Sequence, residues 1–149
     1  MIYLLDTDTF IFMARGMKSN RRPGQRRRAQ ELVDRCRKAQ TRGDSVGLSA
    51  ITVSELEFGA QNSGRYEAEM AAVRKLLIPF DIYDYESLSC PPHYGRIRHE
   101  LESLGVTIGS MDLLIAAHAF ALDATLISNN VVHFSRIKGL RTANWVSRS

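Results

Sequence analysis

The chain has few of the residues that build disulfide frameworks or zinc sites. Its 149 residues include only two cysteines, Cys36 and Cys90. They lie far apart, and neither has histidine or cysteine neighbours at the spacing of zinc ligands. Disulfide-linked folds belong to oxidising compartments. We therefore expect two free thiols in a protein of the reducing cytoplasm.

Long apolar runs are also missing. The longest, residues 113–122, is interrupted by His118 and is shorter than the roughly 20 residues that span a bilayer. No basic-then-apolar signal precedes the first predicted strand, and the sequence contains no internal repeat or low-complexity segment. We therefore expect a soluble, cytoplasmic protein that does not enter a membrane, with residues 1–149 forming a single domain.

Positive charge is concentrated in one part of the chain. The formal net charge is +4, but residues 15–42 contain 11 of the 20 basic side chains and only two acids, Glu31 and Asp34. That segment therefore carries a formal charge of +9 and the remainder −5. Such a segment is typical of a protein that binds a polyanion. A solvated helical face is the alternative interpretation.

Apolar periodicity predicts an α/β fold with four or five strands in a mainly parallel sheet. Strands are predicted at residues 2–6, 45–48, 79–83 and 125–128, with a fifth at 140–144. Helices are predicted at residues 9–15, 25–42, 52–61, 64–77, 91–104 and 112–122.

Carboxylates follow or precede several of these elements at positions where ligands commonly bind. Asp6 ends the first strand, and parallel sheets bind ligands at the carboxyl ends of their strands. Glu55 follows the second strand, and Asp112 opens the helix that begins after Gly109. We expect all three acids to lie at strand-to-helix junctions, which face one edge of a parallel sheet. Each has a structural alternative. Asp6 or Asp112 can serve as a plain N-cap, and Thr52 with Glu55 matches a capping box.

A divalent metal ion would resolve the repulsion among three such carboxylates at one edge of a sheet. Oxygen ligands without nearby histidine or cysteine suit Mg²⁺ or Mn²⁺. Ser128 and Asn130, at the end of the fourth strand, are candidate accessory ligands or partners of a metal-bound water. Turn formation is the alternative role for both.

An ordered set of motifs resembles the toxin components of VapBC toxin–antitoxin pairs, which belong to the PIN-domain ribonuclease family. The resemblance covers almost the whole chain. The motifs are YLLDT (3–7), SAITVSELEFG (49–59), YGRIR (94–98), IGSMDLLIAAH (108–118), TLISNN (125–130) and FSRIKGL (134–140).

This resemblance implies an α/β/α sandwich whose acidic pocket binds Mg²⁺, through Asp6 and Asp112, and cleaves RNA. The acids of the family fall on Asp6, Glu55 and Asp112, which are the predicted catalytic residues. Three positions depart from the family pattern. Asn130 stands where many relatives have a fourth acid, and His133 stands where a further acid is often found. Asp8 stands where asparagine or serine is common. A complete second metal site is therefore not expected.

The resemblance also implies a growth-inhibiting toxin that acts on RNA, a VapB-like antitoxin, a toxin homodimer and a toxin–antitoxin hetero-oligomer. The segment 16–44 is more arginine-rich than expected for the family. Its predicted phosphate contacts are Arg21, Arg22, Arg26, Arg27 and Arg28. An apolar stripe on the helix at 64–77 can face either a partner subunit or the protein's own sheet; it consists of Tyr66, Met70, Val73 and Leu77.

Two other functions compete with a nuclease. Asp6-Thr7-Asp8 after an apolar strand also resembles the opening motif of haloacid-dehalogenase-type phosphatases. Too little chain follows residue 129, however, to hold the downstream lysine and acidic pair of that superfamily. The second alternative is a non-catalytic basic module that binds nucleic acid and uses its acids only as helix caps.

Overall fold

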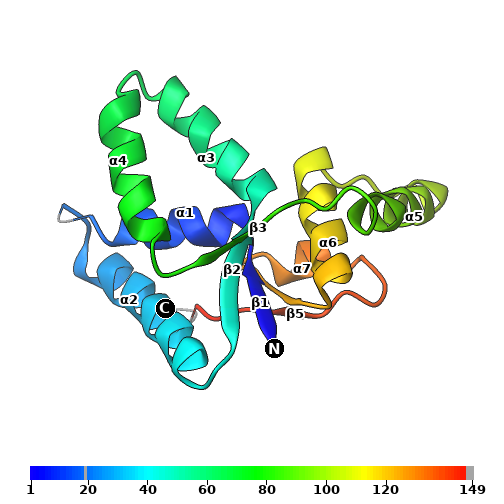
Figure 1. The fold of residues 1–149 in the computed structure, drawn as a ribbon, viewed down its shortest axis with the longest axis horizontal. Helices are drawn as coiled ribbons and strands as arrows, with labels where there is room; N and C mark the ends of the chain where they lie inside the picture. The colour runs from blue at the N-terminus through cyan, green and yellow to red at the C-terminus, as the bar shows by residue number, and fades with distance from the viewer. Residues whose placement is uncertain (19, 147–149) are drawn as a thin grey trace.

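The structure is a computed structural model that describes residues 1–18 and 20–146 (Figure 1). Its strands are β1 (Ile2–Leu5), β2 (Ser45–Ser49), β3 (Asp81–Tyr83), β4 (Thr125–Ile127) and β5 (Thr142–Ala143). Its helices are α1 (Thr7–Gly16), α2 (Pro23–Thr41), α3 (Ala50–Asn62), α4 (Tyr66–Leu77), α5 (Cys90–Ser103), α6 (Ser110–Leu122) and α7 (Val131–Phe134).

The strands pair in the order β3-β2-β1-β4-β5, and every pairing in the described residues is parallel. β1 lies at the centre, with Leu5 opposite Leu48 of β2 and opposite Ile127 of β4. The predicted parallel sheet is confirmed. The carboxyl ends of β2, β1 and β4 therefore lie side by side at one edge, which we call the carboxyl edge.

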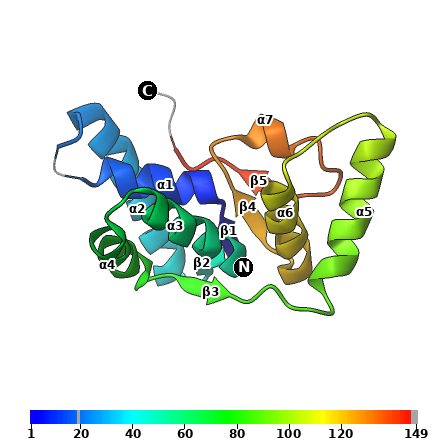
Figure 2. The same cartoon turned by 90° about the horizontal axis from the view of Figure 1, so that it is seen from above.

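Helices cover both faces of this sheet, as Figure 2 shows, with α1–α4 on one side and α5–α7 on the other. Leu4 packs with α5 and α6, whereas Leu5 packs with α1 and α2. Adjacent residues of a strand point to opposite faces, so the apolar run at the start of the chain serves two cores. The predicted α/β/α sandwich is confirmed.

The basic helix predicted at 25–42 is α2. One face of α2 is buried, and its residues there are Ala29, Leu32, Cys36 and Ala39. Cys36 and Cys90 are both free, as predicted, and the structure shows that both are buried. Burial raises the pKa of Cys36 to about 12, so this thiol stays protonated and unreactive at neutral pH.

The apolar stripe on α4 faces the protein's own interior. Met70 is buried, and Val73 and Leu77 pack against the core that contains Leu5. Intramolecular packing, rather than contact with a partner, therefore accounts for these three side chains. No helix in the described ranges is long and apolar enough to cross a membrane.

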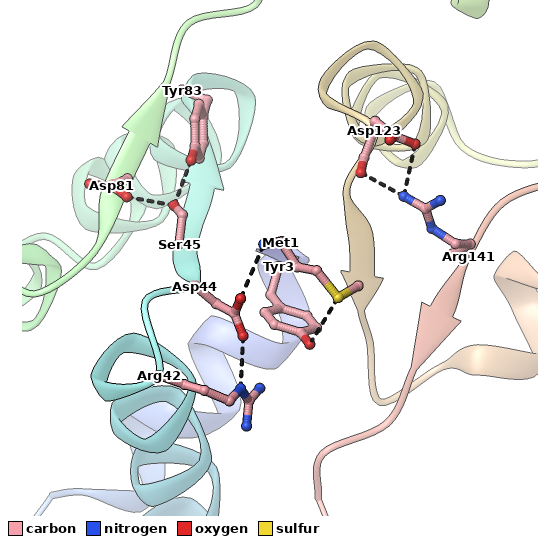
Figure 3. Close-up of polar contacts among 9 residues, drawn as sticks. All are labelled: Met1, Tyr3, Arg42, Asp44, Ser45, Asp81, Tyr83, Asp123 and Arg141. Carbon is pink, nitrogen blue, oxygen red and sulfur yellow. Dashed lines mark hydrogen bonds and ion pairs between the residues drawn. The ribbon is translucent and has the colours of Figure 1, made fainter.

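Acidic residues at the opposite, amino edge of the sheet have cationic or hydroxyl partners (Figure 3). Arg42 pairs with Asp44 at 2.9 Å, and Arg141 pairs with Asp123 at 2.9 Å. Ser45 donates a hydrogen bond to Asp81 on the neighbouring strand. Asp44 and Asp123 of this amino edge therefore each have an arginine partner.

Candidate active site

Three chain segments bring the predicted acids to the carboxyl edge. Asp6 directly follows β1, and Glu55 lies in the second turn of α3, which follows β2. Asp112 reaches this edge by a different route from the one predicted. It lies in the first turn of α6, which follows a helix and leads into β4. Because α6 ends where β4 begins, its first turn lies at the opposite end, beside the carboxyl ends of the strands.

Asp6 is almost fully enclosed and uses its two carboxylate oxygens differently. Its Oδ1 accepts the main-chain N–H of Thr9 at 2.8 Å and so caps α1, as the structural alternative predicted. Its Oδ2 accepts the hydroxyl of Ser128 at 2.6 Å. Burial raises the pKa of Asp6, the hydrogen bonds from Ser128 and Thr9 oppose that rise, and repulsion from Asp8 adds to it. The carboxylate is therefore held in place by hydrogen bonds, but these bonds do not fully offset the cost of burying its negative charge.

Glu55 does not belong to a capping box. The N-cap of α3 is Ser49, whose hydroxyl accepts the N–H of Ile51 at 3.0 Å. Thr52 lies inside the helix, where its hydroxyl meets that of Thr7 at 2.9 Å. The Thr7 hydroxyl donates to Oε1 of Glu55 at 2.7 Å. Glu55 is thus linked through Oε1 to Thr7, the residue that follows Asp6. Its second oxygen, Oε2, remains for other partners.

Asp112 is not an N-cap either, since α6 is capped at Gly109. Its Oδ2 lies 3.2 Å from Nε2 of His133 in α7. Nδ1 of His133 lies 2.6 Å from the guanidinium of Arg136. A guanidinium only donates hydrogen bonds, so this Nδ1 is an acceptor and the neutral ring carries its proton on Nε2. Arg136 therefore fixes His133 as a donor to Asp112.

His133 is the residue that sequence reasoning undervalued, because an isolated histidine carries no motif of its own. The only available signal was its place near the acid position of related proteins, three residues after Asn130.

Among the predicted accessory residues, Ser128 is buried and contacts Asp6 directly. Asn130 is exposed, and its main-chain N–H donates to the Ser128 hydroxyl at 2.9 Å. Asp8 is exposed near Asp6.

No lysine or arginine in the described part of the chain forms an ion pair with Asp6, Glu55 or Asp112. The three acids share this edge, but no group of three or more acidic, histidine or cysteine side chains among residues 1–18 and 20–146 is arranged to hold a metal ion by itself. Mg²⁺ commonly takes only one or two carboxylates and keeps several waters. The oxygen-only donors and the buried Asp6 therefore fit an open Mg²⁺ site better than a closed protein cage.

The predicted phosphate contacts lie around the start of α2. Arg22, Arg26 and Arg27 are exposed. Arg21 is half-buried and donates through Nε to the main-chain carbonyl of Arg15 at 3.2 Å. Arg28 is also half-buried, and its Nε is buried without a partner in the described structure. Arg28 is therefore less accessible than the prediction required.

Comparison with known proteins places this geometry in a family. The PIN-domain model matches residues 3–140. Ribonuclease VapC2 of Rickettsia felis is 34% identical over 145 residues, covering 97% of this chain and 98% of the relative. The tRNA(fMet)-specific endonuclease VapC of Shigella flexneri is 35% identical over 98 residues, covering 66% of this chain and 74% of the relative.

The fold agrees with these matches. The crystal structure of VapBC2 from Rickettsia felis, bound to a DNA fragment from its promoter, contains a similar chain with a TM-score of 0.82. It is 31% identical, and the match covers 97% of this chain and 99% of that one. Similarity over nearly the whole chain does not support the haloacid-dehalogenase alternative. The chain belongs to the PIN-domain family and, within it, to the VapC ribonucleases.

Proposed function

We propose that the protein is a divalent-metal-dependent endoribonuclease that hydrolyses RNA at the carboxyl edge of its sheet. The observation that carries this proposal is the state of Asp6, which is 3% exposed and has a pKa raised by burial. A buried carboxylate without a cationic partner is costly, and such costs are common at functional sites. Membership of the VapC ribonucleases supports RNA as the substrate.

Mg²⁺ is the proposed cofactor, with Mn²⁺ as a substitute. Asp6 and Asp112 are its proposed ligands, and both offer the carboxylate oxygens that these ions prefer. When bound, the ion would supply an activated water and would neutralise charge on the phosphate oxygens.

The protein's own groups orient the reaction. The hydroxyl of Ser128 and the N–H of Thr9 hold Asp6, and Nε2 of His133 holds Asp112. Oε1 of Glu55 accepts the Thr7 hydroxyl, which leaves Oε2 to accept a proton from the attacking water. In-line attack by water would leave a 5′-phosphate and a 3′-hydroxyl, and the 2′-hydroxyl would not be the nucleophile.

RNA would be positioned by the basic segment 15–42. Arg21, Arg22, Arg26 and Arg27 are the proposed phosphate contacts, and Arg28 contributes to the charge of the segment.

A second proposal concerns the biological role of the protein. Similar chains have been crystallised as VapBC complexes, and we infer that this cytoplasmic protein is the toxin of such a pair. It would form a homodimer, bind a VapB-like antitoxin in a hetero-oligomer, and inhibit translation and growth when released.

The proposed activity is tested by incubating the purified protein with initiator tRNA and with an unstructured RNA, in Mg²⁺ or in EDTA. Initiator tRNA is a suitable first substrate because one relative is named for it. Cleavage should require Mg²⁺. Asp6→Ala, Asp112→Ala and Glu55→Gln should each lower the rate by more than about 100-fold, the upper end of the losses seen when metal-site partners are removed.

Glu100→Ala is the matched control, because Glu100 is an exposed acid on α5 whose ion-pair partner is Arg96 of the same helix. Its cleavage rate should equal that of the wild type, and circular dichroism should confirm that every variant is folded. Cleavage that persists in EDTA and in both aspartate variants would contradict the proposal. RNA binding without any cleavage would instead favour the non-catalytic basic module.

A further inference from the structure

A cavity of about 480 Å³ lies beside the carboxyl edge of the sheet. It is bounded by α1, the start of α2 and the segment that follows β4. Its volume is within the range of about 300–1,000 Å³ that is typical of small-ligand sites. None of Asp6, Glu55 and Asp112 lines it. The cavity nevertheless adjoins the site, because Asn129 lines it and directly follows Ser128, the hydrogen-bond partner of Asp6.

The cavity combines an aromatic ring with two cationic side chains, one of which is anchored by a hydrogen bond. Phe12 of α1 is half-buried and lines it. Arg21 lines it as well, and its Nε is anchored on the carbonyl of Arg15, which leaves its two terminal nitrogens free to point elsewhere. Arg15 and Gln25 complete the polar lining on this side.

Close packing of α1 and α2 holds these groups together. A Cβ added to Gly16 would lie 2.4 Å from Cβ of Ala29 and 3.1 Å from the carbonyl oxygen of Gln25. The absence of a side chain at Gly16 therefore permits α2 to approach α1, and Gln25 of α2 and Phe12 of α1 line the same cavity. The pocket is part of the helix packing rather than a chance gap between loops.

Apart from Arg21, the polar side chains that line the cavity have no partner among the residues that the structure describes. The side chains of Asp8, Arg15, Gln25 and Asn129 form no hydrogen bond or ion pair with any other residue that the structure describes. The cavity thus offers donors, from two guanidinium groups, and acceptors, from a carboxylate and two amides. A phosphate group alone would make no use of the aromatic ring and would be repelled by Asp8.

We propose that this cavity binds an unstacked nucleobase of the RNA substrate, next to the phosphate that is cleaved. Bases that leave a stack are bound by aromatic and guanidinium planes and are read through hydrogen bonds to their edges. Phe12 and Arg21 supply the planes, and Asp8, Gln25 and Asn129 supply the edge contacts. The inference rests on the proposed ribonuclease function, and it assigns the substrate to single-stranded or looped RNA.

The test compares two fluorescent RNA probes of equal length, one a single-stranded octamer and the other its fully abasic analogue. Binding to the full-length protein is measured by fluorescence anisotropy in EDTA at fixed salt. Phe12→Leu keeps an apolar side chain but removes the ring, and it should weaken binding of the octamer about tenfold. It should leave binding of the abasic probe unchanged.

Phe58→Leu is the matched control, because Phe58 is 70% exposed on α3 and does not line the cavity. It should change neither affinity. Gln25→Ala, at a half-buried position, provides a second variant with the same expected pattern should Phe12→Leu unfold. Thermal melting of each protein establishes whether it is folded.

Equal affinity of the wild type and both cavity variants for the octamer would overturn the inference. So would an equal loss of binding for the two probes, which would indicate a phosphate site. A cleavage assay on the same preparations separates the two proposals. If the wild type cleaves RNA while the cavity variants bind normally, only the nucleobase pocket is wrong; if it never cleaves, the proposed function fails independently.

Discussion

At the scale of single residues, Asp6 caps a helix at the position where we propose that a metal ion binds. One oxygen caps α1 through Thr9 and the other accepts the Ser128 hydroxyl. A carboxylate offers about four lone-pair sites, so both hydrogen bonds leave capacity for a cation. The sequence presented capping and metal binding as alternatives, whereas the arrangement of the two oxygens makes the cap compatible with the proposed metal role.

Arg136 is predicted to act on the site through His133, since it fixes the ring proton on the nitrogen that faces Asp112. Arg136→Met should weaken Mn²⁺ binding, measured by electron paramagnetic resonance without RNA. It should also lower kcat about tenfold, as loss of an outer partner of a metal ligand typically does. KM for RNA should change much less.

His133→Gln and His133→Leu form the matched pair for this prediction. Glutamine keeps an N–H donor near Asp112, whereas leucine removes it, so the glutamine variant should retain more Mn²⁺ affinity and more activity. If the leucine variant binds Mn²⁺ and cleaves RNA like the wild type, the histidine has no positioning role.

At the scale of helices and strands, the sequence predicted which elements exist better than where they begin. Ser49 and Thr52 are both good N-caps, and local sequence cannot choose between them. The choice is made by the pairing of β2, whose Leu48 lies opposite Leu5 and opposite Ile82, so that the strand ends at Ser49. α7, four residues long, is too short to show helical periodicity and was not predicted.

Local sequence also predicted only part of the candidate active site. The strand end at Asp6 could be predicted, because an apolar run gives way to a carboxylate. Asp112 was expected at the same edge but by a wrong route, since its position there depends on α6 running back along the sheet. Contacts between distant segments, such as Ser128 with Asp6 and Arg136 with His133, have no local signature.

α6 carries a pH-sensitive contact with β2. His118 is buried, and its Nδ1 lies 2.7 Å from the hydroxyl of Ser49. Burial lowers the pKa of His118, so the native state favours the neutral ring. The unfolded chain then binds the extra proton, and stability should fall as the pH drops below about 6.5, the ordinary value for histidine.

The melting temperature, measured in EDTA, should therefore fall between pH 7 and pH 5.5 in the wild type. His118→Gln removes the titrating group and should show a smaller fall. His99→Gln, at an exposed position, is the control and should behave like the wild type. Identical pH dependence in all three proteins would contradict this account of His118.

α2 is predicted to bind RNA rather than a second protein subunit. Its apolar face is buried, while Arg26 and Arg27 are exposed. Reversing both to glutamate, and leaving the half-buried Arg28, should weaken RNA binding. It should also reduce the slope of log affinity against log salt, by about 0.7 for each phosphate of a single strand that the variant no longer neutralises.

Light scattering on the same double variant should still show the proposed homodimer. The matched control is the reversal of Arg74, an exposed arginine on α4, which should leave RNA binding unchanged. A double variant that becomes monomeric while binding RNA normally would mean that α2 faces another subunit.

At the scale of the whole molecule, the charge distribution and the sheet topology define two regions, the basic segment 15–42 and the carboxyl edge with its acids. Residues 15–42 carry +9 and the rest of the chain −5, and the parallel sheet directs the uncompensated acids to one edge. α1 connects the two regions, because Asp6 caps its start and Arg15 lies in its last turn. An RNA strand lying along α1 would place phosphates on the basic segment and one phosphate at the acids.

We propose that the acids of the carboxyl edge cleave RNA by directing water at the phosphate. Mass spectrometry of the products, obtained from one defined RNA in Mg²⁺, tests it most directly. Attack by water should leave a 5′-phosphate and a 3′-hydroxyl at the new ends, formed by the wild type and not by Asp6→Ala. Products ending in a 5′-hydroxyl and a 2′,3′-cyclic phosphate would contradict it, because they require the 2′-hydroxyl of the RNA as the nucleophile.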